Sequence, residues 1–222
     1  MGKIKLSEQK LHAIIKESIN RIIRESLDEM AYDPNFLDGI DSIDSRSINM
    51  FIQSMIPQGN RVSKNSPYKP IRQLVLYFSP EGATKHGGKL TKDIVNFILR
   101  DNEMRGVVYE ISQADKKILD TIYGENKAFG KDLMQQIVWN LDTMSGLFFK
   151  LNDLMDKSNI RNYFSGSEAI DGSSDGKRVG LSTIMYRAFM ATNEIKKQIK
   201  RMQDLVDKPK DPFGYNTGRF RR

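Results

Sequence analysis

One segment of the sequence has residue types and a spacing that could bind a phosphate group. The apolar run Ile71–Phe78 (IRQLVLYF) precedes a glycine-rich stretch, Ser79–Lys89, and apolar residues at helical spacing follow in Ile94–Leu99. An apolar strand, a glycine-rich loop and a helix together place free backbone N–H groups around an anion at the positive end of a helix dipole. The segment therefore indicates phosphate or nucleotide binding as one candidate chemistry.

Two families share parts of this pattern. Ala83–Lys89 resembles the P-loop of nucleotide-binding proteins (A-x-x-x-x-G-K), but Leu90 occupies the place of the hydroxyl that binds Mg²⁺. The string LVLYFSPEGAT resembles the phosphate loop of the flavodoxin family through Ser79, Gly82 and Thr84, with an alanine where asparagine is usual. A flavodoxin-like or nucleotide-binding role is therefore a minor alternative. The simpler interpretation is a strand–turn–helix connection in which the glycines serve the turn.

The composition excludes several classes of catalytic site. The chain has no cysteine, which rules out disulfides, thiolate metal sites and a cysteine nucleophile. Its two histidines, His12 and His86, are too few for a histidine metal cluster and argue against a Ser-His-Asp triad. No acid, base and nucleophile occur at a spacing typical of an active site. We therefore expect no enzymatic activity, no cofactor and no bound metal.

The chain is moderately basic. Its 35 Lys and Arg residues against 28 Asp and Glu give a net charge of +7 and an isoelectric point near 9.4. Such a charge is typical both of an ordinary soluble surface and of one that binds nucleic acid or an acidic protein. Basic residues cluster on the predicted exposed face of a C-terminal helix and in the aromatic tail Lys208–Arg222. The residues expected to contact nucleic acid or a partner are Lys196, Lys197, Lys200, Arg201, Arg219, Arg221 and Arg222.

The N-terminal residues predict an amphipathic helix that needs a partner. Ser7 is a good N-cap, and apolar residues then recur every three or four positions as far as Leu27. A helix with such a stripe is not stable alone in water. It docks either on its own domain or, as an interaction arm, on another chain. The face expected to contact a partner helix carries Leu11, Ile15, Ile19 and Ile22.

This N-terminal string also carries a resemblance. KIKLSEQKLHAIIKESINRIIRESL (Lys3–Leu27) is similar to a segment that recurs at the N-terminus of many proteins of crAss-like and related Bacteroidetes phages. The matching positions are Leu6, Ser7, Glu8, Leu11, His12, Ile14, Ile15, Lys16, Glu17, Ser18 and Arg21. The resemblance implies a phage origin and association with the virion, and it identifies no activity.

Periodicity along the rest of the chain predicts a mainly α protein, a helical bundle with a small β element near residues 71–78 and 106–111. We expect an N-terminal helical arm (1–30), a linker (31–67) with a short helix that Ser45 caps and that continues through Met55, a helical core (68–207) and a basic aromatic tail (208–222). Trp139 and Phe149 widen the apolar stripe of the longest predicted helix, so we expect that helix to be buried on more than one side. Gly146 is expected to permit a close helix crossing.

Together these observations favour a virion structural or assembly protein, of the ring or head–tail connector type. Extended arms at both ends of a helical body are the parts by which a chain joins an oligomer. Its partners would be other virion proteins and copies of itself, in the virion or the host cytoplasm. The competing hypothesis is a basic nucleic-acid-binding accessory protein. No apolar run reaches the length of about 18 residues that a membrane span requires, so no membrane contact is expected.

Overall fold

The computed structural model describes residues 32–40, 43–58, 65–124, 130–160 and 180–207. All regular secondary structure in these ranges is helical, which confirms the mainly α prediction. The helices are α2 (Ser45–Met55), α3 (Lys69–Tyr77), α4 (Pro80–Arg100), α5 (Asn102–Tyr123), α6 (Lys131–Lys157) and α9 (Leu181–Asp207). None of the helices in these ranges is long and apolar enough to cross a membrane.

Side-chain caps and glycine set several helix boundaries. The carboxylate of Asp44 accepts a hydrogen bond from the Ser47 N–H at 2.8 Å and begins α2, so the cap lies one residue before the predicted Ser45. Asp101 caps α5 in the same way through the Met104 N–H at 2.9 Å. Such caps satisfy backbone donors that have no partner inside the helix. Gly124 is the C-cap residue at which α5 ends.

The predicted β element is wrong in both places. The run 71–78 lies almost entirely in α3, where Pro70 occupies the first turn and fixes a backbone angle suited to a helix start. Residues 106–111 lie inside α5, where Val107, Val108 and Ile111 are buried at helical spacing. A short apolar run fits a buried strand and a buried helix turn equally well, so periodicity alone could not distinguish them. The prediction of a strand was therefore wrong.

The glycine-rich stretch Ser79–Lys89 is also helical. Ser79 is the N-cap of α4, and the helix begins at Pro80. Gly82 lies against the preceding helix: a Cβ atom there would stand 1.9 Å from the carbonyl oxygen of Leu76. This glycine therefore permits a tight turn between two helices. Residues 69–100 contain no strand, so the strand–loop–helix arrangement required by both phosphate-binding interpretations is not present.

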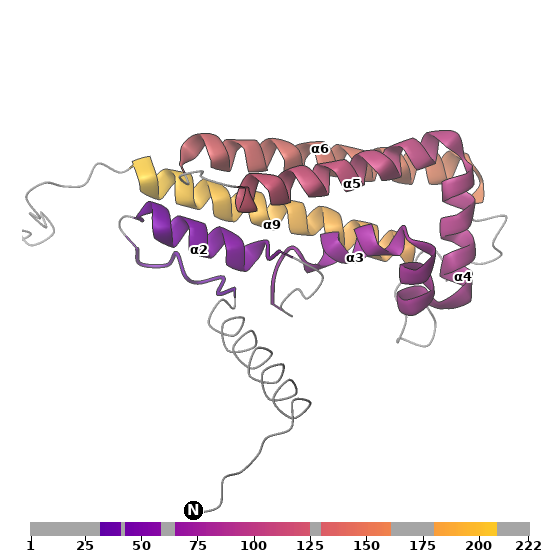
Figure 1. The fold of residues 1–222 in the computed structure, drawn as a ribbon, viewed down its shortest axis with the longest axis horizontal. Coiled ribbons are helices and arrows are strands. Elements are labelled where there is room, and N and C mark those ends of the chain that lie inside the picture. Colours follow the sequence, from indigo (N-terminus) through magenta and orange to yellow (C-terminus); the bar gives the residue numbers. More distant parts are fainter. Residues whose placement is uncertain (1–31, 41–42, 59–64, 125–129, 161–179, 208–222) are drawn as a thin grey trace, which may run out of the picture.

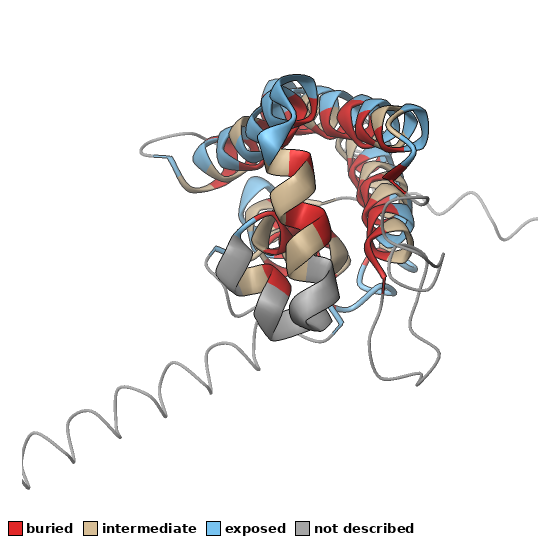
Figure 2. Cartoon of the chain, turned by 90° about the vertical axis from the view of Figure 1, so that its right-hand side faces the viewer, coloured by how far each residue is buried: buried red, intermediate tan, exposed pale blue. Residues whose placement is uncertain are grey.

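Helix α9 runs between the pair α5 and α6 on one side and helices α2 and α3 on the other (Figure 1). Helices α5 and α6 lie side by side, and α9 packs against α6 on one flank and α3 on another. α4 connects α3 to α5 at one end of the bundle. Buried residues lie on the sides of the helices that face one another (Figure 2), and the hydrophobic ones form one cluster that extends from Tyr32 to Leu205. The described residues between Tyr32 and Ile56, which belong to the segment predicted to be a linker with a short helix, contribute to that core.

Candidate interaction surface on helices α6 and α9

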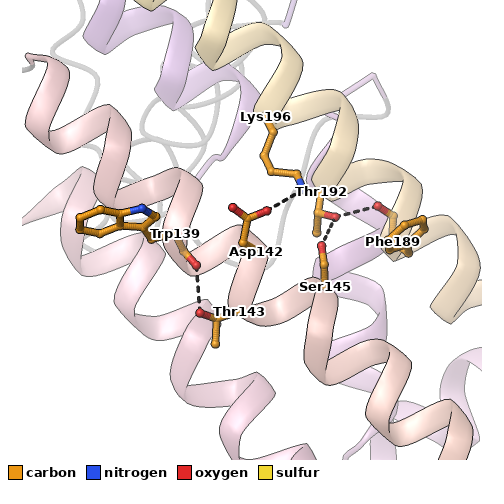
Figure 3. Close-up of polar contacts among 7 residues, drawn as sticks. All are labelled: Trp139, Asp142, Thr143, Ser145, Phe189, Thr192 and Lys196. Atoms are coloured by element: carbon orange, nitrogen blue, oxygen red, sulfur yellow. Dashed lines mark hydrogen bonds and ion pairs between the residues drawn. The ribbon is translucent and has the colours of Figure 1, made fainter.

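Two buried hydroxyl groups join α6 to α9 near the middle of their contact (Figure 3). Thr192 Oγ1 donates to the carbonyl oxygen of Phe189 at 2.7 Å, and Ser145 Oγ lies 2.6 Å from Thr192 Oγ1. Because a threonine hydroxyl has one proton, Ser145 is the donor in the contact between the helices. Ser145 and Thr192 are both buried. A satisfied polar pair inside an apolar interface fixes how the two helices are aligned along their axes.

Beyond this pair, toward the C-terminal end of α6, the two helices enclose an apolar pocket. Its volume is about 170 Å³, and it is lined by Phe148, Phe149, Asn152, Ser182, Met185, Tyr186 and Phe189. The rings of Phe149 and Phe189 meet edge to face with their centroids 4.7 Å apart. Ser182 Oγ is buried at the pocket and has no hydrogen-bond partner among the described residues.

The size and lining of the pocket indicate what could occupy it. A cavity of about 150 Å³ with apolar walls holds a molecule the size of benzene. The pocket is therefore large enough for one bulky apolar side chain and too small for a typical cofactor, which needs about 300 Å³ or more. None of its lining residues is charged. An apolar side chain presented by a partner protein fits this chemistry best.

Exposed aromatic side chains lie at the pocket and beside it. Phe149 and Tyr186 line the pocket and are 61% and 63% exposed, and Met190 lies one turn beyond Tyr186 on α9. Trp139, on the outer side of α6, is 63% exposed. The expectation that Trp139 and Phe149 widen the buried face of this helix is therefore wrong. Large exposed apolar side chains that gather on one face are typical of protein–protein contact sites.

The predicted basic face of α9 is divided by ion pairs. Lys196 Nζ lies 2.8 Å from a carboxylate oxygen of Asp142 on α6 (Figure 3). Arg201 pairs with Asp38, which belongs to the segment before α2. Positions 196 and 201 are about 140° apart around a helix, so these two residues lie on opposite flanks of α9. Two of the four basic residues are thus engaged within the fold.

Lys197 and Lys200 are exposed and form no ion pair with another described residue. Lys200 lines a second, charged groove farther along the same helix pair. The groove is lined by Lys131, Asp132, Gln135, Val138, Lys196, Lys200, Gln203 and Asp204. Three lysines and two aspartates line it, so it is not a uniformly basic surface.

The remaining predicted site residues lie outside the described residues. These are the apolar N-terminal face, at Leu11, Ile15, Ile19 and Ile22, and the C-terminal arginines Arg219, Arg221 and Arg222.

The sequence analysis missed a buried polar cluster between α3 and α5. The Tyr68 hydroxyl donates to Asp115 Oδ1 at 2.6 Å, and Arg72 Nη1 donates to Asp115 Oδ2 at 2.8 Å. All three residues are at most 8% exposed. A signal was present, because Asp115 follows Ile111 by four positions and precedes Ile118 by three, which places a carboxylate on the apolar face of α5.

Burial is the main reason why the pKa of Tyr68 lies well above its usual value, and the neighbouring Asp115 carboxylate raises it further. The phenol therefore stays neutral and acts as a donor. Arg72 is less well satisfied, because its Nε and Nη2 atoms are buried without hydrogen-bond partners in the described structure. The cluster thus contains a desolvated pair of charges, Arg72 and Asp115, that joins α3 to α5. Its burial is typical of a structural contact between helices.

Within the described ranges, no three acidic or histidine side chains gather closely enough to hold a metal ion. Comparison of the sequence with protein-family models and with curated proteins gave no match, and comparison with solved structures gave none either.

Proposed function

We propose that this protein is a structural or assembly component of a phage particle and acts through protein–protein contacts on the α6–α9 surface. The N-terminal resemblance to crAss-like phage proteins supports the phage setting. The aromatic pocket supports the mode of action, because its chemistry suits an apolar side chain of a partner. A ring or head–tail connector component that associates with its own copies is the concrete form of the proposal.

The single observation that carries this function is the exposed aromatic pair Phe149 and Tyr186 at the mouth of the pocket. Aromatic side chains in apolar pockets contribute much of the binding energy at protein interfaces. Their exposure leaves apolar surface in contact with water. A partner that covers this surface gains about 25 cal/mol of binding free energy per Å² of apolar area removed from water.

Mass spectrometry of purified particles of the encoding phage tests the virion role directly. We expect the chain in the particle at a copy number set by the symmetry of a ring. A second arm compares particles assembled with the natural protein and with the Phe149→Ser/Tyr186→Ser variant. Because both side chains are exposed, the variant should fold normally and fail to enter particles. Absence of the natural chain from intact particles would refute the virion role.

The alternative, nucleic-acid binding, is favoured by one observation. Lys197 and Lys200 are exposed and have no carboxylate partner among the described residues. If both contact duplex phosphates, replacing both with alanine should lower the slope of log affinity against log salt by about 1.8, at about 0.9 per contact. A truncation that removes 208–222 measures the tail in the same way. No binding near 50 mM salt by the full chain would exclude this alternative.

A further inference from the structure

We propose that the α6–α9 pocket binds the N-terminal segment Lys3–Leu27 of a neighbouring copy of the same chain. This inference rests on the proposed function and names the partner of its interaction surface. The stripe Leu11, Ile15, Ile19 and Ile22 faces the α6–α9 contact of the next molecule and places one apolar side chain in the pocket, in the manner of an amphipathic helix that docks in a groove.

The chemistry of the two surfaces is complementary. Isoleucine and leucine side chains recur on the segment at the i, i+4 and i+7 spacing by which a helix anchors in a groove. The pocket offers aromatic walls at Phe149 and Tyr186 and a flexible floor at Met185. Its volume of about 170 Å³ accommodates one such side chain rather than a whole ligand.

The lengths also agree. A helix over Ser7–Leu27 would be about 31 Å long at the normal helical rise. A cavity lies at each end of the contact between α6 and α9. Ser182 lines the apolar pocket at one end, and Asp204 lines the charged groove at the other. These two positions are about 33 Å apart along α9. One helix of this length could follow the whole contact.

The place where the chain joins the fold favours a neighbouring copy as the source. Tyr32 packs against Phe51 of α2, and Asp38 pairs with Arg201 on the flank of α9 away from α6. Leu27 can lie at most about 18 Å from Tyr32. A segment of the same chain would have to pass around α9, from the flank that carries Arg201 to the flank that faces α6, before it reached the pocket. A segment from a second molecule meets no such restriction.

Because the chain has no cysteine, disulfide trapping can test the contact in the full-length protein. One variant carries Ile15→Cys and a second carries Tyr186→Cys, and the two are mixed under mild oxidation. The matched control replaces Tyr186→Cys with Tyr109→Cys, on α5. Tyr109 is 64% exposed, nearly the same as Tyr186, and does not line the pocket.

We expect about tenfold more linked dimer with Tyr186→Cys than with Tyr109→Cys, because docking raises the effective concentration of the two thiols. Mass spectrometry of the linked peptides should join position 15 to position 186. Equal yields from the two mixtures would overturn the proposal.

Two other results would also overturn it. Rapid dimerisation of the Tyr186→Cys variant alone would mean that the pocket faces its own copy. In a chain that carries both Ile15→Cys and Tyr186→Cys, a link that stays intramolecular on dilution would assign the pocket to the chain's own segment. These results are separable from the virion role, because absence of the protein from particles would not alter the position of the disulfide.

Discussion

Removal of the Asp115 carboxylate should destabilise the fold severely. Asp115 accepts hydrogen bonds from Tyr68 and Arg72, and the Arg72 guanidinium already has two buried nitrogen atoms without partners in the described structure. In the Asp115→Ala variant the guanidinium charge stays buried without a counter-ion. Breaking a buried pair in this way costs about 3–5 kcal/mol of unfolding free energy. At about 2–4 °C per kcal/mol for a chain of this size, the melting temperature should fall by about 6–20 °C.

The control is a second variant, Asp115→Ala with Arg72→Met, which removes both charges and keeps an apolar side chain of similar length. Replacing a buried pair by apolar residues is often nearly neutral, so the double variant should be more stable than Asp115→Ala alone. Urea unfolding measures the unfolding free energy of both variants when it is followed by the helical circular-dichroism band at about 222 nm. The reasoning is refuted if Asp115→Ala loses less than about 1 kcal/mol, which is the net worth of one ordinary hydrogen bond. It is also refuted if Arg72→Met brings no recovery.

Four further predictions concern stability and can be checked by the same unfolding measurements. Gly146 lies exposed inside α6, and a Cβ atom added there would meet no neighbouring atom within 4 Å, so Gly146→Ala should stabilise the protein by about 0.5–1 kcal/mol. Gly82→Ala should instead destabilise it, because the new Cβ would overlap a backbone carbonyl. Because the pKa of Tyr68 is raised in the folded protein, the contribution of this phenol to the unfolding free energy is fully present below about pH 10 and is lost as the pH rises further. Tyr68→Phe should therefore reduce the loss of stability at alkaline pH. Ser145→Ala should cost about 1 kcal/mol, and Thr192→Val more, because it leaves the Ser145 hydroxyl buried without its acceptor.

The helices with long apolar stripes could be predicted from the sequence because their signal is local. In α5, Val107, Ile111 and Ile118 recur at helical spacing, and all three are buried. The run 71–78 was ambiguous because it is too short to show a period, and the proline at its start was the better indicator. Trp139 could have been placed correctly, since it follows the buried Ile137 by two positions and therefore lies about 160° away around the helix.

The polar contacts of the candidate site could not be predicted in the same way. The pairs Lys196–Asp142 and Arg201–Asp38 join residues 54 and 163 positions apart in the chain. Which carboxylate each cation meets depends on how the helices pack, and no local pattern encodes that arrangement. For the same reason the four basic residues were grouped on one exposed face. The expected close crossing at Gly146 is also wrong, because no described residue packs against that position.

The two walls of the α6–α9 pocket are joined by contacts within the chain itself, and this affects how the pocket can act. Its two walls are held in register by the buried hydroxyls of Ser145 and Thr192 and by the ion pair of Lys196 with Asp142. A pocket that exists in advance requires little reordering of its own side chains, so a larger part of the interaction free energy appears as affinity. In the docking that we propose, the ordering cost would fall on the incoming N-terminal segment and leave each contact modest in strength. In the ring that we propose, every copy would give one segment and receive one, and many modest contacts together would yield a stable assembly.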